Sequence, residues 1–318
     1  MALAPPAHAL DGPALQAPAT TERTVSNGPL HGTLVLPADG ERTAAALILA
    51  GSGPVDRDGN LPHARNDSLK ALAHGLAAQG IATLRVDKRG IGASAGAASR
   101  EEALRFDTYV DDAVSWLRTL DGVLAAEAGA ASPEVRRLFL IGHSEGALVA
   151  TRAAQRHAVA GLVLLAGAGE PAGAVIDRQL AAAAVPDSLR AQSRRIVAAL
   201  ERQAPVADVP EELRALYRPS VQPYLMSWLP LDPAAELAKV QAPVLIVQGT
   251  TDLQISTGDA ERLAAARPDT RLVIVAGMNH VLKPAPVERG ANLATYATPD
   301  LPLAPRLIPA IADFMVRR

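Results

Sequence analysis

The sequence predicts an α/β fold, with a mostly parallel central β-sheet and helices on both of its faces. Short apolar runs alternate along the chain with longer stretches of helical periodicity, an order typical of βαβ units. The runs are largely apolar throughout, as expected of strands that helices bury on both faces. With 49% hydrophobic and 20% charged residues, the 318-residue chain can bury a large core.

The first half of the chain supplies five expected strands and three expected helices. Leu30 to Leu36 alternates apolar and polar residues in its first half, so we expect a strand near the sheet edge. The other expected strands are Ala45 to Ala50, Ile81 to Val86, Arg137 to Ile141 and Val159 to Ala166. The expected helices between them are Ser68 to Gln79, Ala103 to Leu120 and Ala147 to His157.

The alternation stops between Gly169 and Pro230. A helical stretch runs from Asp187 to Gln203, where Asp187 can cap the helix start, and several prolines follow it. We expect residues 169–230 to form a helical cap insert over the sheet edge.

The strand pattern resumes after the insert. We expect strands at Val244 to Val247 and Arg271 to Val275, a helix from Gly258 to Ala266, and a terminal helix near Pro305 to Val316. The chain then divides into an N-terminal tail at 1–25, a core made of 26–168 and 231–318, and the cap insert at 169–230.

Composition excludes several classes of function. A net charge of -2 with scattered Lys and Arg argues against nucleic-acid binding. The absence of cysteine excludes disulfides, thiolate metal sites and a cysteine nucleophile. No His and carboxylate cluster has metal-ligand spacing, so we expect no metal and no cofactor. The longest apolar stretch, Ala158 to Gly169, is too short to span a bilayer and fits a buried strand.

The first twenty residues lack the basic and apolar regions of an intact signal peptide. Ala7-His8-Ala9 nevertheless resembles a small-residue cleavage site. Two interpretations therefore stay open: a cytoplasmic protein with a tail, or an exported one whose leader has been removed.

The pentapeptide Gly142-His143-Ser144-Glu145-Gly146 lies between an expected strand and an expected helix. A G-x-S-x-G sequence in this context forms a tight turn that exposes the serine. Glycines two residues either side of Ser144 avoid collisions with the neighbouring strand and helix. The pattern predicts Ser144 as a nucleophile, although a glycine-lined helix start would give the same letters.

A serine nucleophile needs a histidine base and a carboxylate that orients the histidine. In a parallel sheet these groups meet at the carboxyl ends of the strands. Asp252 follows the expected strand Val244 to Val247, and His280 follows the strand that ends at Val275. Each alone has an ordinary interpretation, as a turn residue or a polar surface group. Their joint placement predicts the triad Ser144, Asp252 and His280.

The developing oxyanion needs hydrogen-bond donors. The backbone N–H of Glu145 supplies one at a helix start, and the loop after Ala50 should supply the other. We expect the second donor to be the N–H of Ser52, with Gly53 as the second choice, although this loop could be a simple glycine turn. Ion pairs of Asp56, Arg57 and Asp58 are expected to hold the loop.

The chain resembles serine hydrolases of the α/β-hydrolase fold from Leu30 onward. It is most similar to bacterial carboxylesterases and serine aminopeptidase-like hydrolases that carry a Gly-Ser-Gly-Pro-x-Asp-Arg-Asp loop, and its order Ser, Asp, His is that of the fold. It differs from many relatives in having Ala50-Gly51 where a His-Gly pair is common, which bears on the oxyanion assignment. The segments that carry the resemblance are 51–58, Asp87 to Ser94, Gly142 to Gly146, Gln248 to Asp252 and Gly277 to His280.

The resemblance implies acyl transfer to Ser144. Haloalkane dehalogenases and epoxide hydrolases resemble the same scaffold but carry an aspartate at this position, so we do not expect their reactions here. We expect a small-molecule ester as substrate, cleaved through an acyl-enzyme. Aminopeptidase or thioesterase activity on the same triad and a non-catalytic binding protein remain as alternatives, and the oligomeric state stays open.

Aromatic residues of the insert point to the substrate class. Tyr217, Tyr224 and Trp228 lie close together in a chain with only 3% aromatics, so they could form an apolar wall for an acyl or alcohol group. A small core within the insert would explain them equally well. No dedicated site for a free amine is visible, which favours uncharged esters, although Glu145 beside the nucleophile could bind one.

Overall fold

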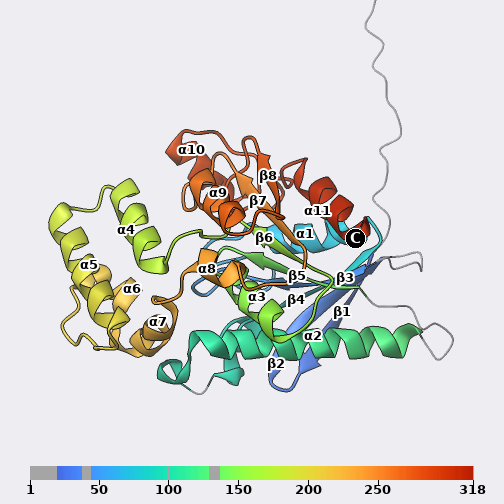
Figure 1. Cartoon of the computed structure of the whole chain (residues 1–318), viewed down its shortest axis with the longest axis horizontal. Coiled ribbons are helices and arrows are strands. Elements are labelled where there is room, and N and C mark those ends of the chain that lie inside the picture. The colour runs from blue at the N-terminus through green and yellow to red at the C-terminus, as the bar shows by residue number, and fades with distance from the viewer. Residues whose placement is uncertain (1–19, 38–43, 99, 129–136, 318) are drawn as a thin grey trace, which may run out of the picture.

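A computed structural model describes residues 20–37, 44–98, 100–128 and 137–317 of the chain. These residues form an eight-stranded sheet in the order β1-β2-β4-β3-β5-β6-β7-β8 (Figure 1). All pairs from β4 to β8 are parallel, whereas β2 runs antiparallel to both of its neighbours. The strands are β1 (Thr20–Asn27), β2 (Leu30–Pro37), β3 (Ala44–Leu49), β4 (Ile81–Val86), β5 (Leu138–His143), β6 (Gly161–Leu165), β7 (Val244–Gly249) and β8 (Arg271–Val275).

Helices cover both faces of the sheet, as the apolar strands predict (Figure 1). One face packs against α1 and α11, whose residues share a buried cluster with alternate side chains of the central strands. The other face packs against α2, α3 and α9. The bounds of these helices are α1 (Ser68–Ala77), α2 (Phe106–Ala128), α3 (Glu145–Arg156), α9 (Thr257–Ala266) and α11 (Leu307–Val316).

Smaller helices complete the connections. Short helices α8 (Pro233–Leu237) and α10 (Arg289–Ala294) precede β7 and follow β8. Single 3-10 turns lie at Gly92–Ala97, Glu101–Ala103, Glu211–Leu213, Pro219–Val221 and Thr295–Ala297.

The N-terminal boundary differs from the prediction. Residues 20–25, assigned to a tail from the sequence, belong to the edge strand β1, and residues 1–19 lie outside the described part of the chain. Val25 is the one buried residue of β1, so the strand has little of the apolar pattern that identified the others. β1 pairs along its whole length with β2, and its Glu22 forms an ion pair with the buried Arg85 of β4 at 2.6 Å.

Residues 169–230 hold a group of helices that lies beside the sheet, at the left in Figure 1. We call this stretch the cap segment. Its longest helix does not begin as predicted: Pro186 occupies the N-cap position and Asp187 is the first helical residue, so the Asp187 side chain does not cap. The helices are α4 (Ala172–Ala182), α5 (Asp187–Glu201), α6 (Arg214–Tyr217) and α7 (Gln222–Trp228).

Candidate active site

Ser144 lies at the turn between β5 and α3 with φ 56° and ψ -122°, a strained conformation for a residue other than glycine. The turn is tight because neighbouring backbones touch it. A Cβ on Gly142 would lie 2.2 Å from the carbonyl oxygen of Gly146, and one on Gly146 would lie 2.5 Å from that of Leu49. The two glycines of the pentapeptide therefore have the steric role that the sequence predicts.

Asp252 and His280 meet although 28 positions separate them in the chain. Asp252 follows β7, His280 follows β8, and these strands are neighbours in the sheet. His280 Nδ1 lies 2.9 Å from Asp252 Oδ2, and both side chains are buried. Because a carboxylate only accepts hydrogen bonds, Nδ1 carries the proton and Nε2 is left as an acceptor.

Asp252 is held as a carboxylate by its surroundings. Burial by itself raises the pKa of this carboxyl, but the charge and hydrogen bond of His280 and two backbone N–H groups outweigh burial, and the pKa lies below its usual value. The backbone donors are Gln254, at 2.7 Å from Oδ1, and Ile255, at 3.0 Å. Asp252 can therefore stabilise a positive charge on His280.

Ser144 and His280 line the same cavity, of about 130 Å³, which we call the His280 cavity. Leu61, Ala64 and Tyr296 form other parts of its wall. Among the described residues, His280 is hydrogen-bonded through Nδ1 to Asp252, with no hydrogen bond joining its ring to Ser144. The structure thus brings the three predicted residues together, but the hydrogen bond between Ser144 and His280 is not formed.

Comparison with known families agrees with this arrangement. The family model described as serine aminopeptidase, S33, matches residues 63–283. The chain belongs to this family. The match includes the serine turn and both loops that carry Asp252 and His280.

Relatives of this S33 family member include esterases and peptidases. Esterase EstD from Thermotoga maritima is 24% identical over 291 residues, which span 84% of this chain and 62% of EstD. Proline iminopeptidase from Mycobacterium smegmatis has a TM-score of 0.56 at 16% identity, covering 93% of this chain and 98% of that one. Est1E from Butyrivibrio proteoclasticus has a TM-score of 0.51 at 17% identity, covering 93% and 98%. The predicted α/β-hydrolase fold is confirmed, and the chain is a serine hydrolase of that superfamily.

His143, inside the pentapeptide of this S33 hydrolase, supports the loop that carries His280. Its Nε2 lies 2.8 Å from the backbone carbonyl oxygen of His280, and the two ring centroids are 4.8 Å apart. Burial, together with a smaller contribution from the neighbouring His280, lowers the pKa of His143 to about 4. His143 is therefore a neutral ring at pH 7 and donates its Nε2 proton to that carbonyl.

The loop after β3 is held by charged side chains, largely as predicted. Arg57 pairs with the buried Asp87 at 2.7 Å, and Asp58 pairs with Arg85 at 2.6 Å. Asp56 departs from the prediction, since it forms no ion pair among the described contacts and instead accepts the backbone N–H groups of residues 58 and 60.

Lys88, directly after β4, contacts the loop segment that holds Ser52. Its Nζ donates to the carbonyl oxygens of Gly51 and Gly53, the second at 2.7 Å. The carbonyl of Gly51 and the N–H of Ser52 belong to one trans peptide unit and so point in opposite directions. Because Lys88 holds the carbonyl, the N–H of Ser52 is directed away from Lys88.

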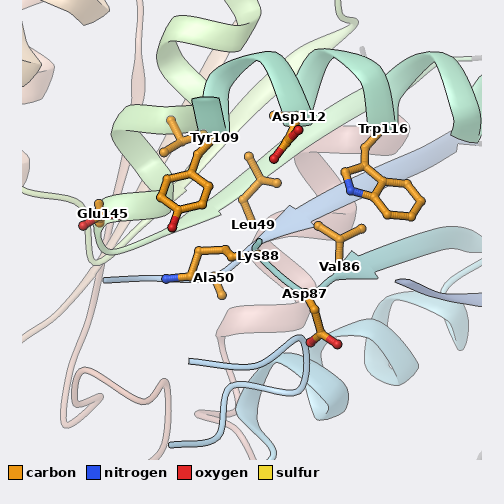
Figure 2. Close-up of a pocket in the computed structure, with 11 residues that line it drawn as sticks. Leu49, Ala50, Val86, Asp87, Lys88, Tyr109, Asp112, Trp116 and Glu145 are labelled. Carbon is orange, nitrogen blue, oxygen red and sulfur yellow. The ribbon is translucent and has the colours of Figure 1, made fainter. Parts of the chain in front are cut away.

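Glu145 lies opposite Lys88. Figure 2 shows the Lys88 side chain extending below the Tyr109 ring toward Glu145. Burial lowers the pKa of the Lys88 amine, whereas Glu145 opposes this change. Burial likewise raises the pKa of the Glu145 carboxyl, against the effects of Lys88 and of Tyr224, whose hydroxyl donates to Glu145 at 2.8 Å.

A second, larger cavity of about 340 Å³ lies between the core and the cap segment. We call it the cap cavity. Its lining includes Ser52, Gly53, Ser144, Tyr224 and Trp228. Tyr224 and Trp228 also pack on each other and on Phe106 of α2, so they serve both as cavity wall and as cap core.

Tyr217 does not have the predicted place in the wall of the cap cavity. Its side chain is fully buried within the cap segment, where its hydroxyl is 2.7 Å from Ser193 Oγ of α5. The sequence could not separate these cases, because Tyr217 and Tyr224 have the same chemistry and differ only in the side of the segment that they occupy.

Within the described ranges, no helix is both long and apolar enough to cross a membrane. The same residues contain no group of three or more His, Cys, Asp or Glu side chains able to hold a metal ion.

Two residues beside the site were not assigned roles from the sequence. Lys88 stands in a motif that supported the family resemblance, but no local pattern indicates that its side chain reaches Gly51. His143 appears in the sequence only as one residue of the serine pentapeptide. Its position between a buried strand and the serine turn was the available signal, because a ring there must lie inside the core.

The low pKa of His143 predicts a pH-dependent stability. When the protein unfolds, His143 regains its ordinary pKa of 6.5, so between that pH and about 4 the unfolded state binds more protons. The contribution of His143 to the free energy of unfolding is therefore full above pH 6.5 and falls as the pH drops to about 4, by about 3 kcal/mol in total. Urea unfolding across this range should show a shallower pH dependence in His143→Gln. The exposed His63→Gln should follow the wild type, and equal slopes in all three proteins would contradict the assignment.

Proposed function

We propose that this chain is a carboxylic-ester hydrolase with Ser144 as nucleophile, His280 as general base and Asp252 as its orienting carboxylate. The observation that carries the proposal is the convergence of a strained Ser144 with the Asp252–His280 pair at one cavity. The family membership and the esterase relative support the same class of reaction.

The reaction proceeds in two acyl transfers. Ser144 Oγ attacks the ester carbonyl while His280 Nε2 takes its proton, and Asp252 stabilises the charged ring. The tetrahedral intermediate collapses, the alcohol leaves with the proton from His280, and the acyl group stays on Ser144. Water then attacks the acyl carbon while His280 takes its proton, the bond to Ser144 Oγ breaks with return of that proton to Oγ, and the acid is released. The bond between Ser144 and His280 closes when substrate binds, as catalytic hydrogen bonds often do.

Two backbone N–H groups stabilise the oxyanion in this proposal. The N–H of Glu145 stands at the start of α3, where the helix dipole favours negative charge. The N–H of Ser52 is the second donor, directed by the contact of Lys88 with the Gly51 carbonyl. Lys88 is thus a positioning residue that acts through the peptide unit.

Residues 169–230 serve as a cap over this site in the proposal, and the rest of the chain from β1 onward is the catalytic core. The cap segment contributes Tyr224 and Trp228 to the cavity that Ser144 lines.

An aminopeptidase activity is the second candidate, because the family carries that description and Glu145 lines the cap cavity. The surroundings of Glu145 disfavour it. A substrate amine would have to replace the Tyr224 hydroxyl on the carboxylate and lie near the Lys88 ammonium, which repels a second cation. An uncharged ester neither displaces the Tyr224 hydroxyl from Glu145 nor meets repulsion from Lys88.

An activity-based probe tests the nucleophile. A fluorophosphonate should label Ser144 in the folded protein, and Ser144→Ala should abolish labelling. His280→Ala should slow labelling by at least about a thousandfold, because the base that activates the serine is lost. His63→Ala is the matched control and should react at the wild-type rate. Absence of labelling in a folded wild-type protein would overturn the proposal.

A substrate panel separates the two candidate activities. We expect p-nitrophenyl esters to be cleaved with kcat/KM at least tenfold above that for aminoacyl p-nitroanilides, because Glu145 is already hydrogen-bonded and faces a lysine. Steady-state rates at several substrate concentrations give the values. A tenfold preference for the anilides would instead identify an aminopeptidase.

Substitution of Lys88 tests its positioning role. Lys88→Met should lower kcat/KM about 10- to 100-fold, through kcat rather than KM. The reason is that the oxyanion that the Ser52 N–H stabilises develops only as the transition state forms, not in the bound substrate. The affinity for a trifluoromethyl ketone, which forms a tetrahedral adduct, should fall in parallel. Lys88→Gln, which keeps a donor, should recover part of the loss.

Lys239→Met is the control, since Lys239 is a solvent-exposed lysine that pairs with Glu236 of α8. It should leave kcat, KM and inhibitor affinity unchanged. A wild-type kcat in Lys88→Met, or a loss in KM alone, would exclude the positioning role.

A further inference from the structure

We propose that the two cavities that meet at Ser144 divide an ester substrate between them. The cap cavity takes the acyl chain, and the His280 cavity takes a short alcohol. This assignment rests on the proposed ester hydrolysis and specifies its substrate class: esters of a long apolar acid with a small alcohol.

Ser144 stands at the junction of the two cavities. Both walls include Ser52, Ser144 and Gln254, so one bound molecule can extend into both. Beyond these residues the walls differ. His280 lines the smaller cavity, of about 130 Å³, and is not part of the wall of the cap cavity, of about 340 Å³.

Proton transfer decides which part of the ester lies on which side. The oxygen of the departing alcohol must receive a proton from His280 Nε2, so the alcohol must lie beside the His280 ring. The acyl carbon stays bonded to Ser144 Oγ after the alcohol leaves. Its chain therefore extends to the other side, where Ser144 lines the cap cavity and His280 does not.

The walls of the cap cavity fit a long apolar chain. Their charged groups already have partners: Glu170 pairs with Arg178 at 2.5 Å, and Arg218 donates to Glu101 at 2.9 Å. What remains is mainly apolar surface from both the core and the cap segment, including Leu148, Val175, Ile176, Leu216, Leu225 and Trp228. Burial of each CH₂ group in such a wall is worth about 0.8 kcal/mol.

The His280 cavity fits a small group. It has less than half the volume of the cap cavity, and its wall includes Leu61, Ala64, Val281 and Tyr296. The same space has a second use, since the water of the deacylation step must also lie beside His280. A short alcohol leaves this space quickly and lets that water enter.

A pair of isomeric esters tests the assignment. Methyl octanoate and heptyl acetate have the same formula and the same seven-carbon chain, on the acyl side in one and the alcohol side in the other. We expect kcat/KM for methyl octanoate to exceed that for heptyl acetate at least tenfold, after each is divided by its rate of hydroxide hydrolysis. Acid release followed by pH-stat titration gives both values. Equal values, or a preference for heptyl acetate, would overturn the assignment.

Two matched substitutions add a test of each wall. Ala215→Phe fills part of the cap cavity and should lower kcat/KM for methyl octanoate at least fivefold, with butyl acetate unaffected. Ala64→Phe fills part of the His280 cavity and should lower kcat/KM for butyl acetate at least fivefold, with its isomer methyl pentanoate unaffected. The opposite pairing of variants and esters would reverse the assignment.

Fluorophosphonate labelling separates failure of this assignment from failure of the proposed function. If Ser144 is labelled and both esters are cleaved without the expected preference, only the division between cavities is wrong. If Ser144 is not labelled and neither ester is cleaved, the proposed function fails, and the assignment fails with it.

Discussion

Close approach of backbone segments at the carboxyl ends of the central strands is the constraint on which the site depends. A Cβ on Gly142 or Gly146 would overlap neighbouring backbone, and one on Gly249 would lie 1.9 Å from the carbonyl oxygen of Met278. The Gly142 contact lets the β5–α3 turn close on itself, and the Gly146 contact lets that turn fit against the end of β3. The third brings the loops after β7 and β8 together, where Thr251 also donates its backbone N–H to Met278 at 3.1 Å. The Asp252–His280 hydrogen bond follows from this contact, because the two loops have little freedom left to separate.

Electrostatics then organises the loop that faces the serine turn. Lys88 and Glu145 are both costly to bury as charges, and each reduces that cost for the other. Lys88 donates hydrogen bonds to two carbonyl oxygens of the loop after β3, and Glu145 accepts a hydrogen bond from Tyr224 of the cap segment. The pair therefore links three parts of the molecule: the loop after β3, the start of α3 and helix α7. A substitution of Lys88 alters the loop after β3 directly, because no other described side chain donates a hydrogen bond to the Gly51 carbonyl.

Sequence patterns predicted strands whose residues are buried along their whole length. They missed features that depend on the direction in which a side chain points. Strand Ile81–Val86 was predicted at its observed bounds, since all of its residues are buried and the run ends where burial ends. Strand Arg271–Val275 was also predicted at its observed bounds, although only Val275 is buried. β1 was missed because its sequence is mostly polar and its pairing is with β2 at the exposed edge. At the site, the sequence placed Ser144, Asp252 and His280 after the ends of three strands at one edge of the sheet, and their roles stay predictions. Tyr217 was misplaced and Lys88 overlooked, because which way a side chain points depends on distant packing.

The cap segment is attached to the core by hydrogen bonds, ion pairs and ring stacking. Helix α7 is held by the Tyr224–Glu145 hydrogen bond and by Ser227, whose Oγ accepts the backbone N–H of Phe106 at 2.8 Å. Stacking of Trp228 on Phe106 adds apolar contact at the same place. At the other end, Arg178 of α4 pairs with the buried Asp259 of α9 at 2.6 Å. The cap segment is thus attached to the core through both α7 and α4, and Arg218 adds an ion pair with Glu101. Because Tyr224 joins the cap directly to Glu145, whose backbone N–H is a proposed oxyanion donor, movement of α7 and the geometry of the serine turn are physically coupled.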